Sequence, residues 1–470
     1  MFAAARRPSR ESIRSARPGR RAGPLALTLA LLFAAPAHAS FFDTYGFSAR
    51  AVARGNAMVA LGFDYDAAYY NPANVLSRKR VHLGFGLDLV TPSLDLTPLA
   101  GTFEPVAVDD NLAFHLGFST PVSGVFDEKI GFGLAFFHPL TTGTNVTSID
   151  PAEPYWYRYQ SLPDKLVVAA AFAAEPFPWL RLGVGAQVLA ALDGDVIAAI
   201  SLAEGRFLRE SIDVDFVPRL APTFGLALGP FPLPGQPEGA GFRFGATLRM
   251  SLALDYRLPV TVDIEQVGTL DVLVEGVSLY TPDQLAVGLS WESAPAPEPG
   301  VSVELGLTWE RWSAAPPAGA RFLLRIDDSN VRPPTDPQDT PDYLIDVRGE
   351  RTPLGAVDTL TPRLGLEWRP TDTLAIRGGW FYRPTQLPVP IYQTNTLDAD
   401  AHVLSLGAGI LFGDPLGAEA APVGIDLTVQ MTAIGSRRVD KDPLAGRPSG
   451  AYDIGGHIWH VSLDLRHDHF

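Results

Sequence analysis

The fold is decided by residues 242–254, which read FRFGATLRMSLAL. Every second residue of this stretch is apolar, and most of the residues between them are polar or small. Because successive side chains of a β-strand point to opposite faces of the sheet, the stretch predicts a strand with one apolar and one polar face. The same alternation recurs in residues 301–309, 423–431 and 459–465. Other alternating runs begin near Val81, Leu112, Ile130, Leu182, Leu285, Leu364, Leu374 and Leu404.

The length of these runs separates a membrane barrel from a soluble β-sandwich, which shares the period of two. The runs extend over about ten residues, the length that a tilted strand needs to cross hydrocarbon. Strands of soluble sandwiches usually have only about five or six residues. Six tryptophans are expected near strand ends, where the aromatic girdles of membrane barrels lie: Trp179, Trp291, Trp309, Trp368, Trp380 and Trp459. The sequence therefore predicts an all-β protein, a transmembrane antiparallel β-barrel.

Proline-rich segments separate the predicted strands. Residues 229–240, 293–300 and 331–342 are rich in proline, which cannot donate to a sheet ladder, so we expect turns or exposed loops there. Between such breaks lie about 14 to 16 candidate strands. A bacterial single-chain barrel has an even number, and we expect about 14 because some candidate pairs look merged. The chain has no cysteine, which excludes disulfides and thiolate metal sites.

The first 39 residues have the pattern of a secretory signal peptide. Seven arginines precede an apolar run at residues 25–35, and Ala37-His38-Ala39 forms a small-x-small cleavage site. The apolar run is too short for a membrane anchor, which needs about 20 residues. Removal of these residues would change the formal net charge from −15 to −21. Such an acidic chain argues against nucleic acid as a partner, and export places the barrel in the bacterial outer membrane.

The segment 40–77 does not alternate like a strand. It carries eight aromatic residues, which are too many for a solvated tail: Phe41, Phe42, Tyr45, Phe47, Phe63, Tyr65, Tyr69 and Tyr70. We expect it to fold inside the lumen as a plug, or hatch. The predicted organisation is therefore a signal peptide (1–39), a hatch (40–77) and a transmembrane β-barrel (78–470).

The hatch also carries the residues of a family resemblance. Gly55-Asn56-Ala57, then Asp64, then Tyr70-Asn71-Pro72-Ala73 resemble the N-terminal hatch of the long-chain fatty acid outer-membrane transporters of the FadL/TodX type. One departure is Asn74, where the family usually has glycine. Four further stretches are similar to the family in the same order along the chain: 157–159 (YRY), 282–288 (PDQLAVG), 376–380 (IRGGW) and 397–409 (LDADAHVLSLGAG).

The resemblance implies a passive transporter of long-chain fatty acids or other hydrophobic compounds. The ligand would be caught by outer loops, enter the lumen and leave sideways through a gap in the wall. Arg158, flanked by Tyr157 and Tyr159, is the predicted ligand-binding group, because arginine pairs well with a carboxylate. The alternative is a loop arginine that binds backbone or lipid phosphate. The hatch fold would rest on seven residues: Gly55, Asn56, Asp64, Tyr70, Asn71, Pro72 and Ala73.

Other functions stay open at this point. A general porin needs an open lumen with charged rings, and a structural or adhesive barrel needs only stable outer loops. His460 and Ser462 lie two residues apart on the polar face of the last strand, where a base and a nucleophile could meet. We nevertheless expect no enzyme, cofactor or metal site. The expected partners are a hydrophobic small molecule, outer-membrane lipids and the barrel-assembly machinery, and we expect a monomer.

Overall fold

A computed structural model describes residues 41–62, 65–99, 107–122, 124, 128–141, 154–161, 166–201, 206–264, 268–317, 320–327, 343–348, 353–390, 394–413, 422–440 and 451–469. All of these residues belong to one compact unit of the chain. The expected signal peptide (1–39), Asp64 and the proline-rich segment 331–342 lie outside the described residues. Within the described part of the chain, no helix is long and apolar enough to cross a membrane.

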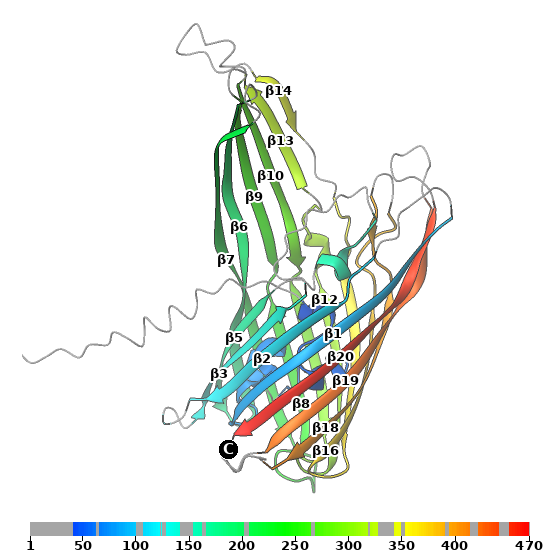
Figure 1. Ribbon diagram of the computed structural model, residues 1–470. Coiled ribbons are helices and arrows are strands. Elements are labelled where there is room, and N and C mark those ends of the chain that lie inside the picture. Colours follow the sequence, from blue (N-terminus) through cyan, green and yellow to red (C-terminus); the bar gives the residue numbers. More distant parts are fainter. Residues whose placement is uncertain are drawn as a thin grey trace, which may run out of the picture. The chain divides into compact units, whose positions relative to one another are not determined.

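Fourteen strands form a closed antiparallel ring, which confirms the predicted barrel (Figure 1). Each strand pairs with the next in the ring, and β20 pairs back onto β1 from Val81↔His469 to Pro98↔Tyr452. In ring order the strands are β1 (Val81–Pro98), β2 (Asn111–Pro121), β3 (Ile130–Pro139), β5 (Val167–Phe177), β6 (Leu180–Ser201), β7 (Arg206–Phe231), β8 (Gly241–Arg249), β11 (Gln284–Glu292), β12 (Gly300–Glu310), β15 (Thr359–Arg369), β16 (Leu374–Arg383), β18 (Ala401–Phe412), β19 (Val423–Val439) and β20 (Tyr452–His469). Closure leaves no unpaired strand edge in the ring, as a barrel within lipid requires.

The two ends of the barrel differ in the length of their connections. At one end, where β20 finishes, tight connections join β5 to β6, β7 to β8, β11 to β12 and β15 to β16. The proline-rich segments 232–240 and 293–299 are two of these turns. We call this the turn end and the opposite one the loop end. In outer-membrane barrels short turns face the periplasm and longer loops face the exterior, so the turn end is the periplasmic one.

Beyond the loop end, the sheet continues outside the ring as an extension, which we call the extension sheet (Figure 1). Its four additional strands are β9 (Leu252–Ile264), β10 (Gly268–Thr281), β13 (Ala320–Asp327) and β14 (Tyr343–Arg348). β9 pairs in parallel with the outer part of β6 and antiparallel with β10, which continues through β13 to β14. These four strands were not expected as a group outside the ring.

The stretch 242–254 is therefore two strands rather than the single strand predicted. β8 ends at Arg249 and β9 begins at Leu252. Between them the Ser251 N–H donates to the Asp283 carboxylate at 2.7 Å instead of to a neighbouring strand. Asp283 lies far along the chain, so the periodicity of the stretch alone could not show the break.

The outer face of the ring is apolar and the inner face is mostly polar. In β1, Leu83, Phe85, Leu87 and Leu89 are 41–48% exposed, whereas the inward-facing Asp88 is 2% exposed. Lipid is the phase that such an outer band requires. The expected tryptophan girdle is only partly present. Trp179 and Trp368 are exposed at the turn end, but Trp459 lies in the middle of β20.

Four short helices lie inside the ring (blue in Figure 1). They are α2 (Phe41–Thr44), α3 (Ala49–Ala53), α4 (Ala67–Tyr70) and η1 (Pro72–Leu76). α3 packs on β16, β18, β19 and β20, and η1 packs on β2, β3, β5, β6 and β7. Helices of four or five residues are unstable alone, so contacts with the wall must hold them in place. The segment thus folds within the lumen, as predicted for a hatch.

Candidate functional site in the barrel lumen

Glycines line the inner wall where the hatch touches it. A Cβ atom added at Gly183 would lie 2.2 Å from the Ala73 nitrogen, and one at Gly379 would lie 2.0 Å from the Gly55 nitrogen. At Gly245 the nearest hatch atom is the Val59 oxygen, 2.1 Å away. Further wall glycines lie against hatch backbone or side-chain atoms: Gly84, Gly117, Gly131, Gly133, Gly225, Gly288, Gly365 and Gly407. We call these wall glycines the glycine belt; a larger residue at any of them would press on the hatch.

The first family motif forms a turn at the end of α3. Gly55 and Asn56 have φ of +60° and +58°, a left-handed conformation that glycine and asparagine adopt most readily. The Asn56 side chain accepts a hydrogen bond from the Tyr70 hydroxyl at 2.8 Å and donates to the Tyr45 carbonyl at 3.3 Å. Asn56 therefore joins three parts of the hatch.

The second motif fixes the hatch to the wall. The Asn71 side chain accepts from the Ala73 N–H at the start of η1, where Pro72 is the first residue. Its amide nitrogen donates to the Val59 carbonyl at 2.8 Å and to the Leu226 carbonyl of β7 at 3.0 Å. Asn74 donates to the same Val59 carbonyl at 3.0 Å, which gives the departure from the family pattern a local role.

Carboxylates of the wall bind the hatch backbone. Glu304 of β12 accepts from the N–H groups of Ala60 and Leu61 at 2.8 and 2.9 Å. Asp464 of β20 accepts from the Ala49 N–H at 2.8 Å and from the Tyr65 hydroxyl. Hydrogen bonds to an ionised acceptor are stronger than neutral ones. These contacts hold the hatch on two sides of the ring.

The His460 and Ser462 pair does not form a base–nucleophile contact. The His460 Nε2 atom lies 2.9 Å from an oxygen of Asp88, in a network that also includes His115. The buried Ser462 hydroxyl makes no hydrogen bond to any residue that the structure describes. Among the described residues, His460 thus contacts Asp88 and not Ser462.

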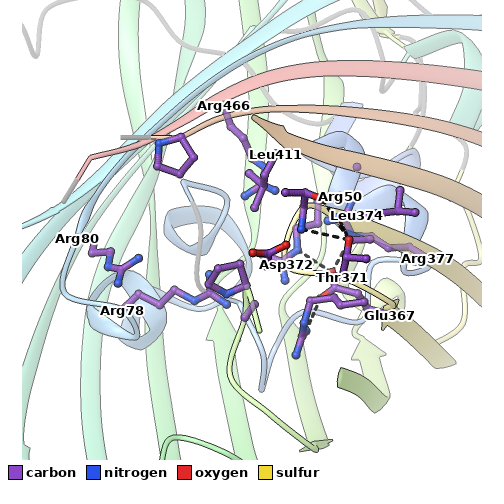
Figure 2. Close-up of a pocket in the computed structure, with 17 residues that line it drawn as sticks. Arg50, Arg78, Arg80, Glu367, Thr371, Asp372, Leu374, Arg377, Leu411 and Arg466 are labelled. Carbon is purple, nitrogen blue, oxygen red and sulfur yellow. Dashed lines mark hydrogen bonds and ion pairs between the residues drawn. The ribbon is translucent and has the colours of Figure 1, made fainter. Parts of the chain in front are cut away.

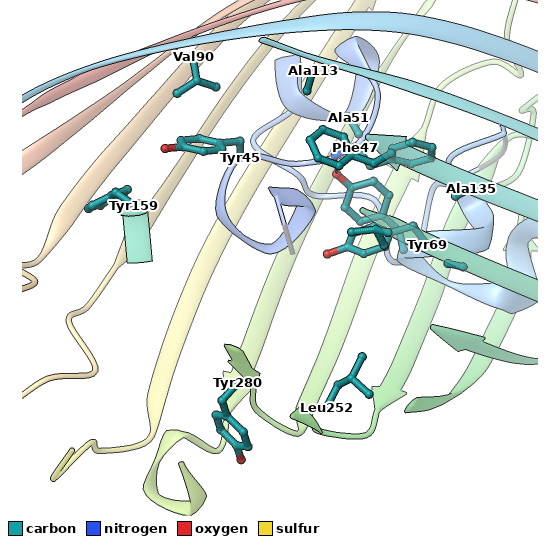
Figure 3. Packing of buried hydrophobic residues seen from close by; sticks show 14 of the residues in the cluster. Tyr45, Phe47, Ala51, Tyr69, Val90, Ala113, Ala135, Tyr159, Leu252 and Tyr280 are labelled. Atoms are coloured by element: carbon teal, nitrogen blue, oxygen red, sulfur yellow. Dashed lines mark hydrogen bonds between the residues drawn. The ribbon is translucent and has the colours of Figure 1, made fainter. Parts of the chain in front are cut away.

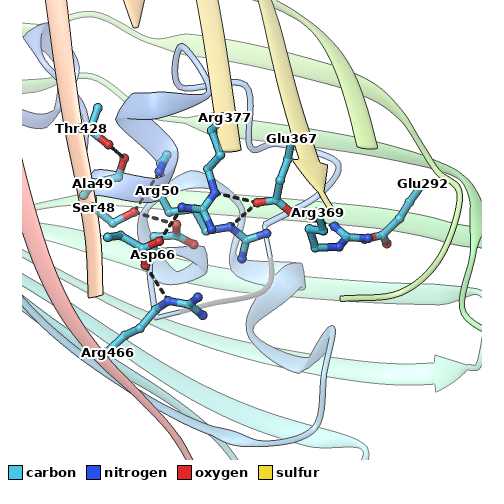
Figure 4. A network of polar contacts seen from close by, with 12 residues as sticks. Ser48, Ala49, Arg50, Asp66, Glu292, Glu367, Arg369, Arg377, Thr428 and Arg466 are labelled. Carbon is cyan, nitrogen blue, oxygen red and sulfur yellow. Dashed lines mark hydrogen bonds and ion pairs between the residues drawn. The ribbon is translucent and has the colours of Figure 1, made fainter. Parts of the chain in front are cut away.

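At the turn end, buried arginines and carboxylates form one connected network (Figures 2 and 4). Glu367 is within 2.7 Å of both Arg369 and Arg377 and 3.3 Å from Arg50 of the hatch. Glu292 and Asp426 extend the chain of contacts to Arg243, Arg369, Arg377 and Arg466. The network contains five arginines and three carboxylates, and it links the hatch to β8, β11, β15, β16, β19 and β20. We call it the arginine network.

At the loop end, aromatic side chains gather above the hatch. Trp156 is the last residue of β4 (Tyr155–Trp156), and Tyr157 is the first residue of η3 (Tyr157–Ser161). Trp312 lies in η4 (Trp312–Ala314). Trp312 packs against Tyr157 and Tyr280, with ring centroids 6.1 and 6.0 Å apart. Figure 3 shows Tyr159 and Tyr280 in the hydrophobic cluster that continues to Tyr45 of the hatch. We call these rings the aromatic cluster.

Arg158 lies in this cluster and not in an exposed loop. It is 1% exposed, its Nη2 atom donates to the Gln386 side chain at 2.6 Å, and its guanidinium lies 5.3 Å from the Trp312 ring centre. Its loop is held by β4, which pairs with β17 (Thr396–Leu397). Among the described residues no carboxylate forms an ion pair with Arg158.

Tyr159 contacts a second buried arginine. The Tyr159 hydroxyl accepts from Arg383, whose guanidinium lies 5.3 Å from the Tyr159 ring centre. Burial raises the pKa of Tyr159 to about 12, so the phenol is protonated. Arg383 is 4% exposed and, like Arg158, has no ion pair within the described part of the chain. Neither buried cation is ion-paired with a described carboxylate, an arrangement that favours an anionic guest.

A small polar cavity lies between the hatch and the barrel wall. It has a volume of about 60 Å³ and is lined by Asp43, Tyr69, Arg249, Glu310 and Arg363, among others. Arg249 forms an ion pair with Asp43 at 2.8 Å and stacks on Tyr69. The cavity is too small for a lipid chain, which would have to move the hatch to pass.

No protein-family model matches the chain, and no curated protein matches it. Among solved structures, a Pseudomonas aeruginosa FadL homologue is 13% identical, with a TM-score of 0.52 over 93% of this chain and 98% of that one. The P. putida toluene transporter TodX is 13% identical, with a TM-score of 0.53 and coverage of 91% and 99%. The CymD monoaromatic hydrocarbon channel is 12% identical, with a TM-score of 0.50 and coverage of 91% and 99%.

At identities of 12–13%, these structural similarities establish the fold and nothing more. They agree with the closed ring of 14 strands, the apolar outer face and the hatch inside the lumen. They also span nearly the whole length of both chains in each comparison. The chain therefore has the fold of the FadL- and TodX-type β-barrels of the bacterial outer membrane.

Proposed function

We propose that this protein passively transports hydrophobic compounds, long-chain fatty acids among them, across the outer membrane. The observation that carries the proposal is the aromatic cluster, which places two buried arginines without acidic partners above a seated hatch. A ligand with an apolar chain and a carboxylate matches this combination of rings and guanidinium groups. The FadL homologue and the hydrocarbon channels of the same fold are consistent with a hydrophobic ligand.

The structure gives less support to the two alternatives. An open porin needs a wide polar lumen, whereas the hatch here fits a belt of glycines and is bound by wall carboxylates. In a structural or adhesive barrel, the extension sheet would serve as the binding surface. That role would not explain the buried arginines inside the lumen.

We also propose that the ligand leaves sideways between β15 and β16. Their pairing runs only from Trp368↔Ile376 to Arg363↔Phe381, the shortest seam that the structure describes in the ring. Toward the loop end the next residue of β15 is Pro362, which has no N–H to donate. A seam that stops short of the loop end has fewer ladder hydrogen bonds to hold the wall closed there, which supports an exit at this place.

The test is ligand binding by purified Arg158→Met protein. We expect oleate affinity to fall at least about tenfold, since a charge-assisted hydrogen bond contributes roughly 1.5–3 kcal/mol. Binding of an uncharged ligand such as hexadecane should change little. Arg311→Met is the matched control, because Arg311 lies near the same end and its side chain is 54% exposed. Equal losses for oleate and hexadecane, or no loss for either, would contradict the assignment of Arg158 to a carboxylate.

A further inference from the structure

A second cavity lies on the opposite side of the hatch, at the turn end. It has a volume of about 230 Å³. Its roof is the hatch backbone at residues 60–62, and its sides include Arg78, Arg80, Arg181 and Arg243. Neither this cavity nor its arginines takes part in the proposed ligand binding at the loop end. We call it the periplasmic cavity.

Arg181 is the unusual member of this lining. The side chain comes from the turn end of β6 and is 5% exposed. It makes no hydrogen bond and no ion pair with any described residue, and its Nε atom is completely buried. Its charge is repelled by Arg243 and attracted by Glu175, but Glu175 already binds Lys79 at 2.8 Å. A buried guanidinium in this position lacks the counter-charge that such groups normally have.

The charge of the lining is also unbalanced. Four arginines face one carboxylate, Glu292. That carboxylate is already shared by Arg243 at 2.9 Å and Arg369 at 3.1 Å. The local excess of positive charge contrasts with the formal net charge of −15 for the whole chain. A concave, positively charged site with an unpaired guanidinium attracts an oxyanion, which arginine binds with two parallel hydrogen bonds.

Arg78 and Arg80 connect this cavity to its neighbour. Both also line the pocket shown in Figure 2, which is bordered by the arginine network. The positive lining therefore continues across the turn end, from Arg181 to Arg466. The neighbouring pocket also contains Glu367 and Asp372, so the arginine without a described partner, Arg181, lies in the periplasmic cavity itself.

We propose that the periplasmic cavity is an anion-binding site for a carboxylate or phosphate group, with Arg181 as its central ligand. Because the hatch backbone at residues 60–62 forms the roof, a bound anion would also stabilise the seated hatch. The group could belong to free phosphate, to the head of an inner-leaflet phospholipid or to a carboxylate that has crossed the barrel. All three present the same oxyanion chemistry to the arginines.

The experiment measures phosphate binding to the full-length protein in an uncharged detergent. Calorimetric titration with sodium phosphate, against sodium chloride of equal ionic strength, should show saturable binding to the wild type. Arg181→Gln should weaken it at least tenfold, and Arg181→Lys should restore part of it. Arg257→Gln removes an exposed arginine of the extension sheet and should bind like the wild type. The heat-modifiable mobility of the folded barrel on a gel verifies that each variant is folded.

Two further arms identify the source of the anion. Competition by octanoate would assign the site to carboxylates, and weaker phosphate binding in phosphatidylglycerol vesicles than in phosphatidylcholine vesicles would assign it to lipid heads. Absence of both effects would leave free phosphate as the ligand. Wild-type affinity in Arg181→Gln, or non-saturable binding in the wild type, would overturn the proposal. The Arg158→Met variant leaves the periplasmic cavity intact. Unchanged oleate affinity in this variant would therefore count against the loop-end function alone and not against the anion site.

Discussion

At the scale of single residues, the seat of the hatch depends on the glycine belt. We predict that Gly379→Ala loosens the hatch, because the added Cβ would lie 2.0 Å from the Gly55 nitrogen. Overpacking of this kind costs about 1–3 kcal/mol. The expected result is a lower thermal unfolding temperature together with a higher conductance in planar bilayers.

The adjacent glycine provides the control for this prediction. A Cβ at Gly378 would have its nearest neighbour, the Leu406 side chain, at 3.9 Å, which is ordinary contact. Gly378→Ala should therefore keep the conductance of the wild type. If both variants behaved alike, close contact between hatch and wall could not be the reason.

Several of these residues could not be found from the sequence. In an alternating strand a glycine is neutral, so Gly183 or Gly379 carries no signal until the hatch is placed against it. Arg158 was predicted in an aromatic-rich loop, but its burial could not be predicted, because its partner Gln386 lies 228 residues away. The arginine network pairs residues from six different strands, so its ion pairs cannot be seen in any one stretch of sequence. Arg181 differs from these arginines only in having no described hydrogen-bond or ion-pair partner, which the sequence does not show.

At the scale of elements, the buried tyrosines of η3 should make the stability of the fold fall at alkaline pH. The pKa of Tyr159 is about 12 in the folded protein, raised by burial from its ordinary value near 10. Burial also raises the pKa of Tyr157. The folded state thus holds these protons more tightly than the unfolded chain. Their contribution to stability is complete below about pH 10 and is lost as the pH rises toward 12.

The measurement is the unfolding temperature between pH 9 and 12, in steps of about half a unit, with tyrosinate absorbance recorded in parallel. We expect Tyr159→Phe to show a smaller decline over this range than the wild type, because one of the protected protons is gone. Identical profiles for the two proteins would show that Tyr159 titrates like an exposed tyrosine.

The seam between β15 and β16 makes a prediction about release. The chain has no cysteine, so a pair introduced at Pro362 and Tyr382 can be bridged by a short bifunctional maleimide without background. We expect the bridge to slow the uptake of oleate by at least about threefold in proteoliposomes, since it closes the proposed exit. A bridge between Leu87→Cys and Leu463→Cys, which pair in the β1–β20 seam, should leave uptake unchanged. Normal uptake with a closed β15–β16 seam would move the exit elsewhere.

Alternation predicted the strands of the ring well, because each has lipid on one side and the lumen on the other. The extension sheet was missed for the same physical reason. Its strands leave the membrane, so no apolar phase imposes a period on their outer faces. The break at Ser251 depends on a carboxylate, Asp283, that only the folded chain brings near. Local periodicity thus predicted the strands of the ring. The break at Ser251 depends on a contact between distant residues, which periodicity does not show.

At the scale of the whole molecule, the hatch decides what can pass. We predict low conductance for the full protein in planar bilayers and a large conductance after deletion of residues 40–77. The reason is that the segment occupies the lumen and contacts strands on opposite sides of the ring. High conductance in both proteins would favour the open porin. A deletion variant that still shows a folded, heat-modifiable barrel is needed for the comparison.

The seam between β1 and β20 also governs how the molecule is made. Val81 pairs with His469, so the contact that closes the ring joins residues separated by almost the whole barrel sequence. Contacts of such sequence separation form slowly, because the loop between them must first be ordered. The ring cannot be complete before the last strand has left the export channel. Until then the first strand exposes an open edge, and the nascent chain needs protection from aggregation in the periplasm.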